Sequence, residues 1–268
     1  MLVRSIPLTE PLVISAVPLA RDAFAPFGDV VANPRPDSTP SNTAPESIAH
    51  GELPYGAVSA NQGTAIQYKG LASMRDLYGT APSRKAGSPR MTMYVCGART
   101  LAAKGGWRDD GEREADGIEI KVLERHPFTT QTFIPLTADG TKRYLVVVAP
   151  TLDAASEDED LPVPDREEAA GLPGPGLPDL LRLTAFVATG EQAVTYGAGT
   201  WHAPMIALGP PYSTVDFVVV QFANDVPVED CQEVAIEGGD AKDGAEAARI
   251  WVRVSEEKRE TERGFADL

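Results

Sequence analysis

The chain has 268 residues, 43% of them hydrophobic, and a formal net charge of −15. That is enough apolar material for a sizeable core in one large domain or two small ones. The negative charge argues against a nucleic acid or an anionic membrane as a partner, because both attract basic faces.

Targeting and redox signals are weak along the chain. No apolar run approaches the roughly 20 residues needed to span a bilayer. The mildly apolar residues 1–20 contain Glu10 and several prolines, which disfavours a signal peptide. The two cysteines, Cys96 and Cys231, lie far apart, so neither a disulfide framework nor a metal-binding cysteine motif is predicted. We therefore expect a cytoplasmic protein with reduced thiols.

The first half of the chain predicts short strands. Apolar segments are interrupted by 23 prolines and 24 glycines, which favours a β-rich fold. Residues 14–31 predict a strand, a short helical turn around 20–24 and a second strand. Residues 33–47 read as an irregular loop, and 55–71 predict a strand pair interrupted at Gly63.

Further strands follow in the middle and second half. Residues 91–99 alternate as a strand does, and the β-branched run 143–150 predicts a strand buried on both faces. Residues 183–208 predict strands separated by glycine-containing turns, and 213–224 predict another strand. The pattern favours a mainly β sandwich or small barrel with a few short helices.

Two charged segments stand apart from this pattern. An acidic, proline-rich insert at about 151–178 is expected to be a solvated excursion and not a second domain. A charged C-terminal tail at about 238–268 contains one candidate short helix or strand, around 247–254.

The run L-E-R-H-P-F-T-T-Q-T-F-I-P-L at 123–136 holds Glu124, Arg125, His126 and Gln131 beside β-branched and aromatic residues. Alternate side chains of a strand share a face, so Glu124 and His126 point one way and Arg125 points the other. Small barrels of the cupin class place a His-x-His-x(3–4)-Glu set on one strand pair, with a last histidine three residues after a glycine. The corresponding positions here are Glu124, His126, Gln131 and His202, so the spacing fits while the ligand set is altered.

These residues also have plain structural interpretations. Glu124 and Arg125 could form a surface pair worth under about 1 kcal/mol. His126 could lie at the rim of the fold, Gln131 could bond a backbone group, and His202 could be a hydrogen-bonded core histidine.

Several segments together resemble the ureidoglycolate lyase family, formerly called ureidoglycolate hydrolase. They are the run at 123–136, Y-L-V-V-V-A-P at 144–150, the stretch 185–208 with its G-A-G-T-W-H, and F-G-D-V-V and N-Q-G-T-A nearer the start. The resemblance covers about residues 17–236 and is more similar to the fungal branch than to the short bacterial one. It implies a single cupin-like domain over 1–268, usually dimeric. The implied activity is that of an amidine-type carbon–nitrogen lyase, which releases urea and glyoxylate from ureidoglycolate in purine (allantoin) catabolism.

The chain departs from the bacterial pattern at four positions. Gly197 and Ala203 stand where bacterial members carry histidines, and Gln221 and Phe222 replace a common Asp-Arg pair. If one of the absent groups is essential, the substrate would differ.

The chemistry of ureidoglycolate suggests catalytic roles. One carbon bears a hydroxyl, a carboxylate and the urea nitrogen, so lysis needs a base for the hydroxyl proton and an acid for the departing nitrogen. His202 is the first candidate for the base and His126 the next. Glu124, if desolvated, could stay protonated and act as the acid.

Other residues are expected to bind the substrate or a metal. Gln131 and Tyr196 are expected at the cavity wall, and Lys69 or Arg90 could hold the carboxylate. No cofactor is certain, but a divalent ion at Glu124, His126, Gln131 and His202 is an open alternative. Two other functional classes also stay open. One is a metal-dependent hydrolase or dioxygenase on a cupin scaffold, and the other is a non-catalytic small-molecule binder.

Overall fold

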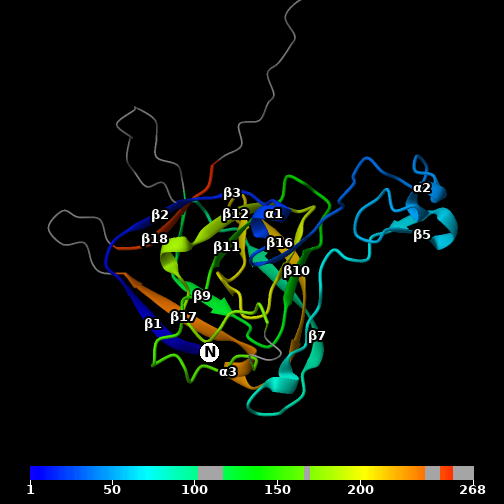
Figure 1. Ribbon diagram of the computed structural model, residues 1–268. Helices are drawn as coiled ribbons and strands as arrows, with labels where there is room; N and C mark the ends of the chain where they lie inside the picture. The colour runs from blue at the N-terminus through cyan, green and yellow to red at the C-terminus, as the bar shows by residue number, and fades with distance from the viewer. Residues whose placement is uncertain (102–116, 166–169, 239–247, 256–268) are drawn as a thin grey trace, which may run out of the picture.

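The computed structural model describes residues 1–101, 117–165, 170–238 and 248–255, in which three sheets stack in layers (Figure 1). The middle layer is an eight-stranded sheet in the order β1-β17-β9-β14-β11-β12-β3, with β15 also beside β11. Its strands are β1 (Leu2–Leu8), β3 (Val17–Pro18), β9 (Val122–Arg125), β11 (Arg143–Ala149), β12 (Thr184–Thr189), β14 (Trp201–His202), β15 (Ile206–Leu208) and β17 (Gln232–Gly238).

A five-stranded antiparallel sheet covers one face of the middle sheet, in the order β4-β13-β10-β16-β7. Its strands are β4 (Gly28–Val31), β7 (Ser88–Gly97), β10 (Gln131–Pro135), β13 (Ala193–Tyr196) and β16 (Thr214–Ala223).

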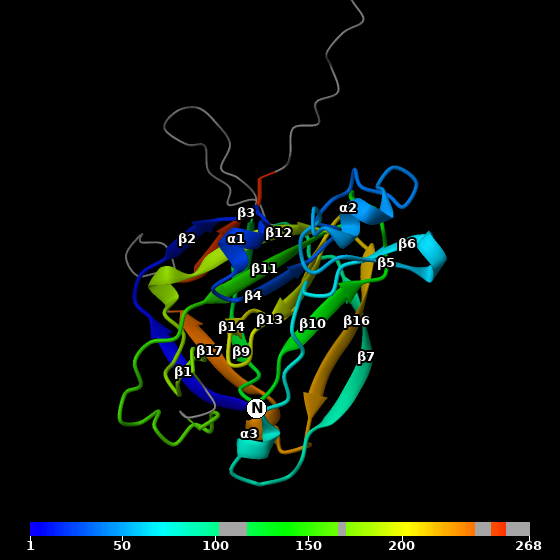
Figure 2. The same cartoon turned by 45° about the vertical axis from the view of Figure 1, so that its right-hand side comes forward.

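A three-stranded sheet covers the other face, and a small hairpin with α2 projects to one side (Figures 1 and 2). The three strands are β2 (Leu12–Ser15), β8 (Gly117–Ile120) and β18 (Ile250–Arg253), and the hairpin is β5 (Val58–Ala60) with β6 (Ala65–Gln67). The short helices are α1 (Arg21–Phe24), α2 (Pro45–Ala49) and α3 (Pro227–Asp230), with 3-10 turns at Asn61–Gly63, Tyr78–Thr80 and Leu180–Arg182.

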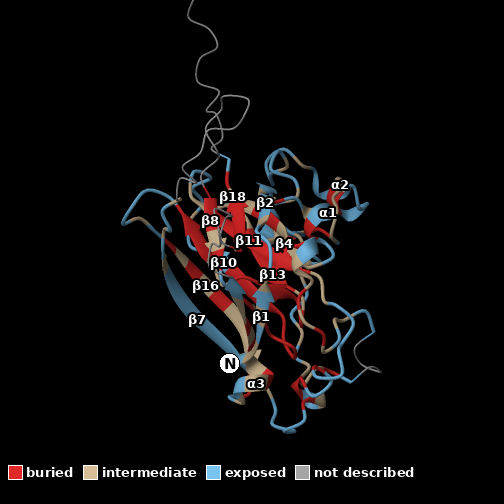
Figure 3. Ribbon diagram, turned by 90° about the vertical axis from the view of Figure 1, so that its left-hand side faces the viewer, coloured by how far each residue is buried: buried red, intermediate tan, exposed pale blue. Residues whose placement is uncertain are grey.

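Strand β11 joins the two cores, as its continuous apolar run predicts. Tyr144, Val146 and Val148 point into the core shared with the five-stranded sheet. The alternating residues Leu145 and Val147 point into the core shared with the three-stranded sheet. The buried strands lie in the middle of the molecule in Figure 3. A single-domain organisation stays a prediction, supported by this sharing of one strand between both cores.

The mainly β, sandwich-like prediction is confirmed, but a closed barrel is not formed by the described residues. Closure would require hydrogen-bonded neighbours for every strand. Strands β4 and β7 are the two edges of the five-stranded sheet, and β1 and β3 are those of the middle sheet. The arrangement is therefore two facing open sheets with a third layer behind.

Most predicted elements are present. The turn around 20–24 contains α1, and the strand pair around Gly63 is β5 and β6, with Gly63 itself at a positive φ of 87°. The candidate element around 247–254 contains β18. The rest of the predicted tail lies largely outside the described residues.

The acidic insert was expected to be solvated, and the structure corrects this for part of it. Asp158 and Leu161 are buried, and the Asp158 carboxylate pairs with Arg4 Nε at 3.3 Å. The carbonyl of Pro162 accepts a hydrogen bond from Gln232 Nε2 at 2.8 Å. Polar anchors, which composition does not reveal, hold the insert on the body.

The strongest anchor is Arg125, which lies on the face of β9 opposite Glu124 and is fully buried. Its guanidinium stacks over the Trp201 ring at 4.5 Å and donates to Gln232 Oε1 at 2.8 Å. It also donates at 2.8–3.1 Å to the backbone carbonyls of Gly174, Pro175 and Gly176. Arg125 is therefore a clamp on the end of the insert and not a surface residue.

Arg125→Leu should destabilise the fold by about 3 kcal/mol or more, because the buried Gln232 amide and the carbonyls of the insert would lose a charged donor. Urea unfolding measures this change in free energy. Arg182→Leu is the matched control: Arg182 is exposed in its pair with Asp179, and its removal should cost under about 1 kcal/mol. Equal effects of the two substitutions would contradict the clamp.

Candidate active site

Two rows of side chains face each other between the middle sheet and the five-stranded sheet. In the middle sheet, His202 of β14 pairs with Glu124 of β9, which pairs with Glu233 of β17. Directly paired residues on neighbouring strands share a face. Because Val148 pairs with His202 and points into the core shared with the five-stranded sheet, the whole row faces that sheet.

The opposite row crosses the five-stranded sheet. Tyr196 pairs with Gln131, Gln131 with Gln221, and Gln221 with Arg90. The two rows touch where the rings of Tyr196 and His202 stack, with centroids 3.9 Å apart and an interplanar angle of 12°. The sandwich thus brings residues far apart in sequence into one place.

The two imidazoles are held in the same tautomer. His202 Nδ1 lies 2.9 Å from the Thr200 carbonyl, and His126 Nδ1 lies 2.7 Å from the Asp230 carbonyl. A carbonyl oxygen can only accept, so Nδ1 carries the proton in both rings. Each Nε2 is then an acceptor, and both are buried without a hydrogen-bond partner among the described residues.

Burial keeps these imidazoles neutral. It lowers the pKa of His202 to about 3, with a further contribution from neighbouring His126, whose ring centroid is 5.5 Å away. Burial also lowers the pKa of His126, against the opposing effect of its bond to Asp230. Near neutral pH both rings therefore offer lone pairs and no charge.

Glu124 is the titratable group of the site. Burial, followed by repulsion from Glu233, raises its pKa to about 7. Its Oε1 lies 3.6 Å from His202 Nε2, and its Oε2 lies 3.9 Å from Cys231 Sγ. At neutral pH this carboxyl group is populated in both protonation states, which suits a group that accepts and returns a proton.

The amide side chains complete the polar lining. Gln131 Nε2 donates to Gln221 Oε1 at 2.6 Å, and Gln131 Oε1 is buried without a partner. The pair leaves an unused amide acceptor on the residue next to Tyr196, whose ring stacks on His202, and a ligand with N–H groups could bind it.

The structure gathers most of the predicted site residues. Glu124, His126, Gln131, Tyr196 and His202 lie together. Arg90 lies further along the same row, at the exposed rim, where its Nη2 bonds Asp225 Oδ2 at 2.8 Å. Lys69 is exposed and follows the β5–β6 hairpin, which projects from the body of the molecule (Figure 2).

The same atoms could hold a metal ion. Ligand atoms of Glu124, His126 and His202 lie within 4.8 Å of one another. Imidazoles whose Nδ1–H is bonded to a carbonyl, with Nε2 unpaired, are typical of metal-binding histidines. The donor set of two imidazoles and a carboxylate suits a divalent transition metal.

Two large grooves are lined by other residues. One of about 1040 Å³ is lined by the insert together with Phe27 and Thr200. Another, of about 940 Å³, lies beside Val17 and Arg143. The candidate active site is identified by its buried, unpaired acceptors, because the volume of a groove does not indicate which reaction takes place in it. Among the described residues, no helix is both long and apolar enough to cross a membrane.

Comparison with known proteins decides the family. The ureidoglycolate lyase family model matches residues 11–240. The ureidoglycolate lyase of Schizosaccharomyces pombe is 32% identical over 220 residues, which is 82% of this chain and 89% of that protein. The ureidoglycolate lyase of Saccharomyces cerevisiae is 31% identical over 231 residues, covering 85% and 96%. That of Burkholderia mallei is 30% identical over 212 residues, covering 79% and 84%.

The chain belongs to the ureidoglycolate lyase family. The predicted resemblance is therefore confirmed, and the matched relatives include fungal proteins as well as bacterial ones.

The departures from the bacterial pattern can now be placed. Ala203 packs with Trp201 in the core behind the middle sheet, on the face opposite His202. Gly197 lies in a turn and donates its N–H to the Phe27 carbonyl. A histidine at position 203 would face away from the site, so its absence removes no group from the site.

Sequence reasoning missed two contributors to this lyase-family site. Gln221 was noted only as a departure, although it bonds Gln131. Asp230 was not singled out, because it contributes a backbone carbonyl. The pairing of β10 with β16 would have placed Gln221 beside Gln131. The Asp230 carbonyl belongs to the backbone, so its residue type gives no signal of this role.

Glu124→Gln should reveal the raised pKa as a change in stability with pH. The wild-type carboxyl titrates near 4.5 when unfolded and near 7 when folded. The folded state therefore binds more protons between these values, and stability falls as pH rises through that window. The variant lacks this loss, so its stability relative to wild type should rise by roughly 3 kcal/mol from pH 4.5 to 8. Denaturant unfolding with a chelator present measures it, and a difference independent of pH would refute the raised pKa.

Proposed function

We propose that this protein is a ureidoglycolate lyase that cleaves ureidoglycolate into glyoxylate and urea during purine catabolism. The observation that carries the proposal is Glu124, with a pKa near 7, beside the unpaired Nε2 atoms of His126 and His202. The relatives' names support the same reaction.

Glu124 can serve as both base and acid. As a carboxylate it takes the hydroxyl proton of the substrate while the carbonyl of glyoxylate forms and the carbon–nitrogen bond breaks. The electron pair of that bond stays on the departing nitrogen, which then takes the proton from Glu124. Urea and glyoxylate are released, and the carboxylate is restored. A pKa near the working pH favours both halves of this transfer.

We assign the histidines a different role from the one that the sequence suggested first. A pKa of about 3 makes His202 a weak base. Its Nε2 is better suited to accept a hydrogen bond from protonated Glu124 or from the substrate, and His126 Nε2 can do the same. Both then orient protons that Glu124 moves.

The amide pair supports recognition of the ureido group. Gln131 Oε1 can accept an N–H of the substrate, which would satisfy a buried acceptor. The carboxylate of the substrate would extend toward Arg90, the cation of the same row. Lys69 has no role in this scheme, because it is exposed at the end of the projecting β5–β6 hairpin.

A divalent cation is compatible with this site. His126, His202 and Glu124 would hold it, and when bound it would supply Lewis-acid polarisation of the substrate hydroxyl and carboxylate. This ligand group also favours a second candidate function, a metal-dependent hydrolase acting on the ureido amide.

We also propose that the protein is a homodimer. Strand β7 is a long edge strand whose outward side chains Met91, Met93 and Val95 are 75%, 60% and 64% exposed. Exposed apolar edges of this kind invite pairing with another chain. A solution mass of one chain, 28.5 kDa, in light scattering would contradict the dimer. The cytoplasmic location stays a prediction, which cell fractionation would test.

The purified protein should release urea and glyoxylate from ureidoglycolate in equal amounts, with no free ammonia. Coupled assays for the three products measure this. Stoichiometric ammonia would refute the lyase and favour the hydrolase. Repeating the assay after chelation and after adding back divalent ions tests the metal: rates unchanged by both treatments would exclude an essential metal.

A further inference from the structure

Within the described part of the chain, the His126 ring makes one hydrogen bond. Its Nδ1–H donates to the carbonyl of Asp230, the last residue of α3. The final carbonyls of a helix have no partner within the helix, so they are free to accept from a side chain. The direction of the His126 ring therefore follows the position of this helix end.

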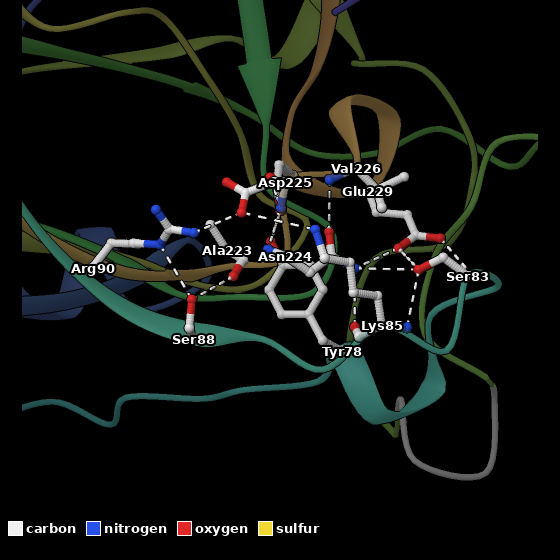
Figure 4. A network of polar contacts seen from close by, with 11 residues as sticks. Tyr78, Ser83, Lys85, Ser88, Arg90, Ala223, Asn224, Asp225, Val226 and Glu229 are labelled. Carbon is white, nitrogen blue, oxygen red and sulfur yellow. Dashed lines mark hydrogen bonds and ion pairs between the residues drawn. The ribbon is translucent and has the colours of Figure 1, made fainter.

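The Asp230 carboxylate is held from three sides. Its Oδ1 accepts the Tyr78 hydroxyl at 2.6 Å and the Asn224 backbone N–H at 2.8 Å. Its Oδ2 accepts the Asp225 backbone N–H at 2.8 Å. Tyr78 is fully buried, and Figure 4 shows its ring directed toward the 223–226 segment. Burial, then the bond to Asp230, raises the Tyr78 pKa so far that the hydroxyl keeps its proton and stays a donor.

A second connection ties α3 to the chain segment that carries Tyr78. Glu229 accepts from the Ser83 backbone N–H at 2.8 Å and from Ser83 Oγ at 2.6 Å. Asn224 Nδ2 donates to the same carboxylate at 2.7 Å (Figure 4). The segment 76–83 thus contacts α3 through two neighbouring carboxylates.

The same segment also contacts the chain just after His126. The rings of Tyr78 and Phe128 pack with centroids 5.8 Å apart. The Leu77 N–H donates to the Phe128 carbonyl at 2.8 Å. Tyr78 therefore contacts both sides of the His126–Asp230 hydrogen bond: the helix that accepts it and the loop that donates it.

We propose that Tyr78 is a positioning residue that, through Asp230, fixes the direction and the Nδ1–H tautomer of His126. With the helix end held, Nε2 of His126 is kept as an acceptor facing His202 and Glu124. The consequence for catalysis rests on the proposed function, whereas the consequence for the tautomer does not.

Tyr78→Phe removes the hydroxyl and keeps the ring that packs on Phe128. Tyr144→Phe is the matched control, because Tyr144 is equally buried and its hydroxyl donates one bond, to the Gln192 carbonyl at 2.7 Å. Both variants should lose a similar amount of thermal stability. Only Tyr78→Phe should disturb His126.

Nitrogen-15 NMR of the imidazoles reads the tautomer directly, and the chain has only three histidines to assign. In metal-free full-length protein at neutral pH, wild type and Tyr144→Phe should show His126 with Nδ1 protonated. Tyr78→Phe should show mixed tautomers at His126 and an unchanged His202. Its kcat should fall roughly 10- to 100-fold, because a small displacement of the His126 ring slows the reaction strongly. The change in KM should be much smaller.

A single Nδ1–H tautomer of His126 in Tyr78→Phe, with kcat equal to that of the control, would overturn the proposal. If Tyr78→Phe does not fold, Asp230→Ala tests the same connection, since it removes the carboxylate that accepts the Tyr78 hydroxyl and keeps the backbone carbonyl that accepts from His126. A shifted tautomer in a protein whose wild type does not cleave ureidoglycolate would refute the proposed function while leaving the positioning role intact.

Discussion

Two hydrogen bonds from imidazole N–H groups to backbone carbonyls determine what this site can do. They place the protons of His126 and His202 on Nδ1 and leave both Nε2 atoms as unpaired acceptors in the interior. Buried acceptors without donors are costly, so they persist where a ligand or ion supplies the missing partner. Their closeness to Glu124 makes them part of one proton-handling group.

The layered fold holds this group from three directions. Register across the middle sheet sets Glu124 beside His202, and Tyr196 stacks on His202 from the five-stranded sheet. Behind the same strands, Arg125 and Trp201 fix the end of the insert. At the side, Tyr78 and α3 hold the partner of His126. Each support comes from a different part of the chain, which explains why the polar residues are scattered in the sequence.

Much of the site could be predicted where the signal was local. Strand alternation correctly placed Glu124 and His126 on one face with Arg125 on the other, and the apolar run of β11 correctly implied burial on both faces. The joint motif pattern identified the family. These signals depend on neighbouring residues and on regular backbone geometry, so they survive without knowledge of the tertiary fold.

The predictions that were wrong or incomplete concern features that depend on contacts between distant parts of the chain. Lys69 follows an ordinary hairpin, and nothing in its sequence shows that the hairpin projects away from the site. The insert reads as solvated because its composition is acidic, yet one buried arginine clamps its end through carbonyls that have no sequence signature. The sheet also stays open at β4 and β7 because these strands do not pair with each other. The alternation of apolar and polar residues predicts strands but not which strands pair.

Replacement of His202 by asparagine tests most directly whether the paired imidazoles take part in the reaction. The change keeps a polar side chain but removes the stacked ring and its Nε2 acceptor. With kcat and melting temperature measured on the same folded sample, we expect kcat to fall by roughly 100-fold, because the proton moved by Glu124 and the substrate would lose an acceptor that orients them. A folded variant with a lower melting temperature and near-normal kcat would show that His202 is only a core residue, and would contradict the site described above.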